Sequence, residues 1–173
     1  VNPATLEVEP IPLADAKEGA IDAKTEYVYF TQYGLQWTLD NANTYRGGSR
    51  GKLWRYRLGS NREASRLGQD HSGSARRPMV HGDKLYFLSD ASGRDNLWSM
   101  DVDGANVAQI TRHEKLSIRG ADIDGGRVIY QLGADLYILD FSNFEPVKLD
   151  IQLPSDHPSL REAWVKDPMK YAT

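Results

Sequence analysis

Residues 84–102, KLYFLSDASGRDNLWSMDV, contain two largely apolar runs separated by a short polar segment. The first run, residues 84–88, is continuous and is typical of a strand that is buried on both faces. The second run, residues 97–102, alternates with the period of two that is typical of a half-buried strand. The Ser92-Gly93 pair between the runs favours a turn. This stretch therefore predicts an antiparallel β-hairpin.

The same hairpin pattern occurs twice more in the chain. Its counterparts are residues 27–30 with 53–58, and residues 127–130 with 136–141. A third, shorter run follows in every copy, at residues 65–67, 108–111 and 147–149. Another candidate strand precedes the second and third copies, at residues 75–82 and 118–125. The repeating unit is therefore expected to contain four strands.

The spacing of the copies indicates the architecture. Leu53 and Leu97 are 44 positions apart, and Gly82 and Gly125 are 43 apart, which matches the period of ~40–45 residues of a four-stranded propeller blade. No segment shows a sustained helical period with caps. We predict an all-β fold, a β-propeller fragment of three four-stranded antiparallel blades. The blades are expected at residues 18–67, 75–111 and 118–149, with residues 150–173 leading toward the next blade or domain.

Three blades leave a propeller ring open, because a closed ring needs ~4–8 blades. The repeat count therefore predicts a larger parent protein. The absence of an initiating Met before Val1 favours the same expectation.

Composition and charge exclude several classes of function. The net charge of −3 and the pI near 5.8 provide no broad basic face for nucleic acid. No apolar window approaches the ~20 residues that cross a bilayer, so we expect a soluble chain without a membrane partner. The chain has no cysteine, which excludes disulfides, thiolate catalysis and Cys-ligated zinc. We expect a cytoplasmic location, with the periplasm as the alternative that cysteine usage leaves open.

The first copy is longer than the second by about 13 residues, and the extra residues form an insertion at positions 33–50. Insertions in repeat proteins lie on one face, which is often the binding face. This insertion contains Trp37, Tyr45, Arg46 and Arg50, residue types that are enriched at binding hot spots. We therefore predict that these four side chains contact substrate or a partner. The alternative is that the loop covers a neighbouring blade or domain.

Arginines also occur in the predicted innermost strands, which line the axial channel of a propeller. Arg76 and Arg77 lie in the second copy and Arg119 in the third. Strand alternation directs either Arg76 or Arg77, but not both, toward the channel. A ring of such arginines would favour acidic groups or C-terminal carboxylates. The alternative is that the arginines form ion pairs with Asp or Glu of the adjacent blade.

Other motifs have simpler structural interpretations. In the glycine-rich residues 47–52, Lys52 is followed by Leu53 and a predicted strand, whereas a phosphate loop continues with Ser or Thr and a helix. Two other roles stay open for these glycines and arginines: contact with a peptide carboxylate, or a crossover between strands. Residues 70–72, Asp-His-Ser, are neighbours on an extended chain and do not form a catalytic triad. The Asp-x-Asp-Gly segments at 101–104 and 122–125 lack the remaining ligands of a calcium loop. The four histidines lack metal-ligand spacing.

We therefore expect no catalytic residue, metal ligand or cofactor on this chain. Aromatic side chains occupy equivalent positions in the three copies and are expected to pack between blades. They are Trp54, Trp98 and Tyr137.

The string at residues 45–54, YRGGSRGKLW, with the hairpin described above and the turn at 101–104, resembles the N-terminal propeller of tricorn-like serine peptidases. The resemblance extends over residues 27–149. In that family the propeller precedes a second propeller, a PDZ-like domain and a peptidase domain with a serine nucleophile. The resemblance implies that these parts follow Thr173.

Two functions remain in contention. The resemblance implies a non-catalytic propeller segment that gates or orients peptide substrates for a downstream peptidase domain. Its partners would be peptides and the other domains of the parent protein. The resemblance leaves a homo-oligomeric parent protein open. The alternative is a WD-like propeller that serves as a protein-interaction scaffold, as in periplasmic translocation proteins. The repeat period is the one observation that supports this scaffold alternative.

Overall fold

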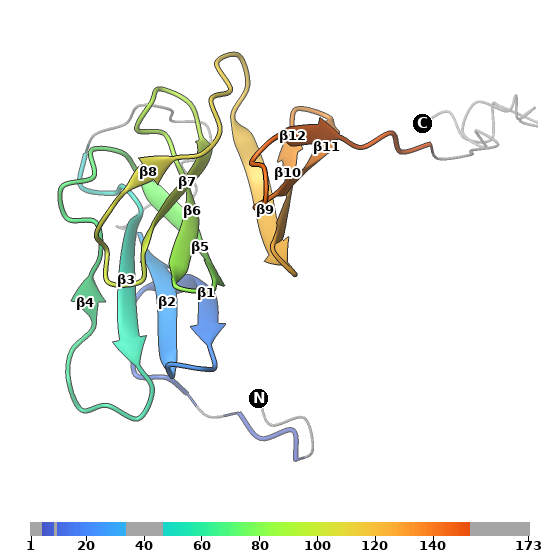
Figure 1. Cartoon of the computed structure of the whole chain (residues 1–173). Coiled ribbons are helices and arrows are strands. Elements are labelled where there is room, and N and C mark those ends of the chain that lie inside the picture. Colours follow the sequence, from blue (N-terminus) through green and yellow to red (C-terminus); the bar gives the residue numbers. More distant parts are fainter. Residues whose placement is uncertain (1–4, 9, 34–46, 153–173) are drawn as a thin grey trace, which may run out of the picture.

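The computed structural model describes residues 5–8, 10–33 and 47–152 (Figure 1). Every helix or strand assigned in these residues is a strand, and the strands form three separate four-stranded sheets. All strand pairs are antiparallel. No helix that could cross a bilayer occurs in this part of the chain. The predicted fold class is confirmed.

Each sheet is one blade, and its strands follow chain order from one edge to the other. Blade 1 consists of β1 (Ala16–Asp22), β2 (Tyr27–Gln32), β3 (Lys52–Arg57) and β4 (Ser65–Arg66). Blade 2 consists of β5 (Ala75–His81), β6 (Lys84–Ser89), β7 (Asn96–Asp101) and β8 (Ala108–Gln109). Blade 3 consists of β9 (Ile118–Asp124), β10 (Arg127–Leu132), β11 (Asp135–Asp140) and β12 (Pro146–Lys148). Sequence analysis did not identify β1, because Ala16–Asp22 contains no apolar run and its first four residues are exposed.

The blades share one register, which follows from the central hairpins. Phe87 lies opposite Trp98 in blade 2, Phe30 lies opposite Trp54 in blade 1, and Tyr130 lies opposite Tyr137 in blade 3. The three aromatic positions identified in the sequence are therefore structurally equivalent.

The core lies between the blades. Strand β6 explains this arrangement, because its side chains alternate between two clusters. Leu85 and Phe87 join a buried cluster with residues of blade 1, whereas Tyr86 and Leu88 join a second cluster with residues of blade 3. Both faces of the middle blade are covered, which is why residues 85–88 read as a continuous apolar run.

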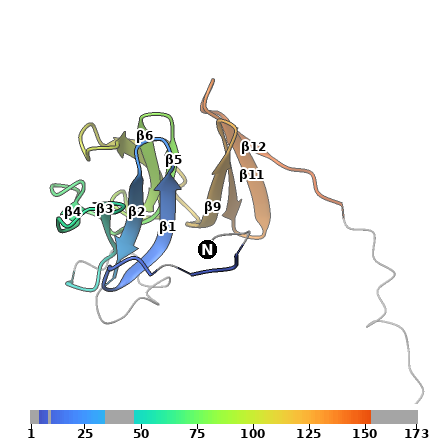
Figure 2. The ribbon, with the colours of Figure 1, turned by 90° about the horizontal axis from the view of Figure 1, so that it is seen from below.

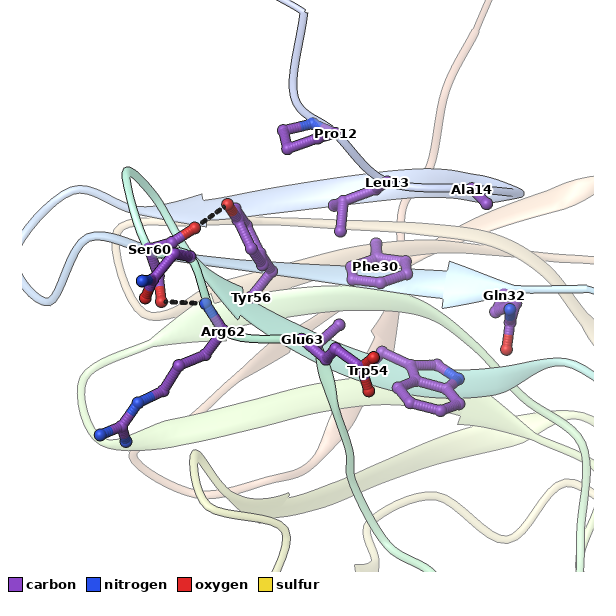
Figure 3. Close-up of a pocket in the computed structure, with 12 residues that line it drawn as sticks. Pro12, Leu13, Ala14, Phe30, Gln32, Trp54, Tyr56, Ser60, Arg62 and Glu63 are labelled. Carbon is purple, nitrogen blue, oxygen red and sulfur yellow. Dashed lines mark hydrogen bonds between the residues drawn. The ribbon is translucent and has the colours of Figure 1, made fainter.

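Trp98 and Tyr137 pack against these clusters but are only half-buried. Trp54 occupies a different setting, since the equivalent side of blade 1 faces away from blade 2. There it lines a hollow of about 520 Å³ together with Phe30 and Tyr56 (Figure 3). The Tyr56 hydroxyl donates to the Ser60 carbonyl at 2.6 Å at the edge of this hollow. The prediction of packing between blades therefore holds for two of the three aromatics, and neither of these is fully buried.

Candidate functional site

The innermost strands β1, β5 and β9 lie next to one another, each at the inner edge of its blade (Figure 2). Each of these strands pairs with the next strand of its blade, and the first residue pair is equivalent in the three blades. In blade 2 this first pair is Ala75 with Ser89. The residue that follows the first paired residue is basic in all three blades. These residues are Lys17, Arg76 and Arg119. The structure thus brings together two predicted arginines and adds a lysine that sequence analysis missed.

Sequence spacing does not reveal Lys17, because it lies 10 positions before Tyr27, the start of β2, whereas Arg76 lies 8 positions before Lys84, the start of β6. The segment Ala16–Asp22 also has no strand pattern of its own. The repeat register of the folded chain reveals the equivalence.

A β-bulge follows the basic residue in the innermost strands. In β5 the pairing register shifts between Arg76 and Met79, and in β1 it shifts between Lys17 and Ala20. Arg77, the first residue inside the β5 bulge, has a φ of 54°, a left-handed conformation that costs ~1–2 kcal/mol for a residue with a Cβ. The prediction that alternation sends only one of Arg76 and Arg77 to the channel side does not apply, because a bulge interrupts the period of two.

Arg76 is buried and forms an ion pair with Asp95, with 3.5 Å between Nη2 and Oδ2. Burial raises the pKa of Asp95, while the Arg76 charge partly opposes that rise. Asp95 precedes β7 in the same blade, so this contact differs from the alternative of a pair with the adjacent blade. The backbone of Asp95 makes the link between blades, since its carbonyl accepts from the Ile118 amide at 2.9 Å.

Arg77 bridges all three blades. Its backbone amide donates to Oε2 of Glu18 in blade 1 at 2.8 Å, and the same carboxylate oxygen accepts from Thr31 and Tyr33. The Arg77 guanidinium extends the other way, to blade 3, where its Nη1 would lie 3.8 Å from a Cβ added at Gly120. The described residues offer this guanidinium no hydrogen-bond acceptor or acidic partner.

The other predicted site residues have different surroundings. Arg119 is exposed, and its charge acts on Asp95. Arg50 lies on the approach to β3, where its Nη1 donates to the Ser72 carbonyl at 2.6 Å. Three predicted residues, Trp37, Tyr45 and Arg46, lie outside the described residues, so their contact role stays a prediction.

The Asp-His-Ser segment at residues 70–72 has a structural role at its histidine. His71 Nε2 lies 2.6 Å from Oγ of Ser89, not from Ser72, and the imidazole packs edge-on against Phe87 and Trp98. Ser89 is completely buried, so its hydroxyl has no access to a substrate. The described residues also contain no group of three His, Asp or Glu side chains that could hold a metal ion.

Comparison with known proteins identifies the family. The family model of the tricorn protease N-terminal beta propeller domain matches residues 1–145. The chain belongs to this family. The tricorn propeller described here is 33% identical over 127 residues to a tricorn protease homolog of Saccharolobus solfataricus, covering 73% of this chain and 12% of that protein.

Solved structures agree on the fold of the tricorn propeller. The crystal structure of tricorn protease superposes with a TM-score of 0.64 at 23% identity, covering 80% of this chain and 13% of that one. The propeller domain of the trilobed protease from Pyrococcus furiosus superposes with a TM-score of 0.54 at 17% identity, covering 89% and 42%. At these identities the superpositions show the propeller fold alone.

Proposed function

We propose that this tricorn propeller is a non-catalytic segment that admits or orients peptides for a serine-type peptidase domain elsewhere in the same protein. Family membership supports the link to a peptidase. The chain spans about 12% of the length of the Saccharolobus solfataricus relative, so the catalytic parts would lie outside it.

The observation that carries the proposal is the guanidinium of Arg77, which has no partner among the described residues. The nearby acids are already engaged, because Glu18 accepts three hydrogen bonds and Asp95 pairs with Arg76. A planar guanidinium of this kind binds a carboxylate through two parallel hydrogen bonds. A peptide with a free C-terminus supplies such a carboxylate.

The backbone around Arg77 supports a positioning role. The Glu18 carboxylate and the Thr31 hydroxyl both accept from the Arg77 amide, at 2.8 and 3.1 Å, so the bulge is tied to the neighbouring blade. A fixed backbone reduces the ordering that the side chain must undergo when a peptide binds.

Peptide binding to the 173-residue chain tests the proposal. Fluorescence anisotropy would compare a labelled peptide with a free C-terminal carboxylate and the same peptide as a C-terminal amide. We expect the carboxylate form to bind more tightly, and Arg77→Gln to weaken its binding roughly 10-fold or more, since a hydrogen bond to a charged group contributes ~1.5–3 kcal/mol. Arg57→Gln is the matched control, because Arg57 is exposed and pairs with Glu26 at the far end of β3. Equal affinities of Arg77→Gln and the parent chain would refute the proposal.

A further inference from the structure

Neighbouring blades of this chain contact each other through a repeated set of positions. Val80 and Trp98 of blade 2 pack against the cluster shared with blade 1. Ile123 and Tyr137 of blade 3 hold the same places in their strand ladders and pack against the cluster shared with blade 2. Each blade thus has a leading face, which meets the blade before it, and a trailing face, which meets the blade after it.

The leading face of blade 1 meets no blade of the described chain. Its contact positions are held by Ile21 and Trp54, the counterparts of Val80 and Trp98. Ile21 is 61% exposed. Trp54 is half-buried and lines the hollow of about 520 Å³, which Leu13 from the segment before β1 also lines (Figure 3). An apolar contact face therefore remains open on blade 1.

The trailing face of blade 3 is also open. Tyr29 of blade 1 and Tyr86 of blade 2 hold one trailing position and are buried against the next blade. Ile129 holds this position in blade 3 and is 41% exposed. It lines a hollow of about 370 Å³ with its cross-strand partner Ile138, and Val147, which pairs with Ile138, is exposed. Apolar positions that the other blades bury are thus uncovered at this end.

The two open faces carry opposite charge. Lys52 and Arg66 lie beside Trp54 on the leading face of blade 1, because Arg66 pairs with Trp54 and Lys52 lies two residues before it. The loop at residues 60–64 adds one Arg and one Glu beside the hollow there, so the balance stays positive. The trailing face of blade 3 carries three acids and one base around Ile129: Asp122, Asp124, Asp140 and Arg127. The two faces are therefore complementary in charge.

From these observations we infer that the trailing face of blade 3 docks on the leading face of blade 1 of a second copy of this chain, so that two copies close one propeller ring. A contact between two different faces repeats from copy to copy until the rotation closes a ring. Propeller rings close with ~4–8 blades, so two copies of three blades fit this range and three copies do not. The inference uses neither Arg77 nor a peptide, so it does not depend on the proposed function.

Sedimentation equilibrium of the 173-residue chain tests this inference. We expect a reversible equilibrium between the 19.4 kDa monomer and a dimer. Ile129→Lys would face the basic leading face and Ile21→Asp would face the acidic trailing face. Each should weaken dimerisation roughly 10-fold or more, since like charges across an interface cost well above the ~1.4 kcal/mol that corresponds to a factor of 10.

Val107→Lys is the matched control, because Val107 is similarly exposed, at 37%, on the turn before β8 of the middle blade. It should leave dimerisation unchanged. All three substituted side chains are exposed within one copy, so each variant should keep the circular dichroism spectrum of the parent chain.

A mixture of Ile129→Lys and Ile21→Asp provides a second readout. A mixed dimer contains one unaltered contact and one contact in which the two introduced charges are opposite, so dimers should return. A dimer built from the same face of both copies would instead survive in one of the two variants alone. That result, a mass that keeps rising beyond the dimer, or a monomer over the whole concentration range would overturn the inference, and the monomer would assign the open faces to other parts of a longer protein.

Discussion

Replacing Arg76 by Met should destabilise the chain through Asp95, the acid that it pairs with. The two side chains are each only 9% exposed, so removal of Arg76 leaves a buried carboxylate without its counter-charge. Breaking a buried pair in this way typically costs ~3–5 kcal/mol. The pair is long, at 3.5 Å, and the Arg119 charge also acts on Asp95. We therefore expect the lower end, about 3 kcal/mol at pH 7.

The pH dependence of this loss has a definite sign. Burial already holds the pKa of Asp95 above its ordinary value, and without Arg76 the pKa should rise further. The folded variant then takes up a proton at a higher pH than the unfolded chain, whose Asp pKa is ~3.9. Its stability is therefore lost as pH rises through the folded pKa and is regained on acidification. The deficit should shrink between pH 7 and pH 5.

Urea denaturation at both pH values would measure the deficit. The double variant Arg76→Met/Asp95→Leu should recover much of the stability, because it removes the unpaired charge as well. Arg57→Met, which disrupts an exposed pair with Glu26, should cost no more than ~1 kcal/mol. A loss below ~1 kcal/mol for Arg76→Met at pH 7, or a deficit that grows on acidification, would refute this reasoning.

Four further predictions concern stability and function. Trp98→Ala should lower the free energy of unfolding by ~2–3 kcal/mol, less than for a fully buried tryptophan because Trp98 is half-buried; a urea titration that shows under ~1 kcal/mol would contradict this. Burial lowers the pKa of His113 in the folded state, so on acidification the unfolded chain takes up this proton at a higher pH than the folded chain does. The free energy of unfolding should therefore fall as pH drops below ~6.5, and urea titrations of His113→Gln should show a weaker dependence on pH. The purified chain should hydrolyse no fluorogenic peptide, and turnover that a single Ser or His substitution abolishes would count against this. Deleting residues 35–47 with a short Gly-Ser join should leave the Tm of the full-length parent unchanged and reduce its peptide processing, whereas a collapse in Tm would indicate a structural loop.

The strands and their repetition could be predicted from sequence because both depend on local patterns. Residues 85–88 read as a buried strand because each side chain meets a core cluster on one face or the other. The four strands that build blade 2 follow from the same spacing. Strand β1 escaped prediction since its exposed residues carry no apolar period.

The sequence by itself determined the all-β repeat, the blade period and the tricorn resemblance, since these depend on residues close together in the chain. Only the tertiary structure decided which basic groups are neutralised. Arg76 meets an acid 19 positions away, and the amide of Arg77 meets one 59 positions away, contacts that no local pattern encodes. The bulges at these positions also break the alternation from which side-chain direction is predicted.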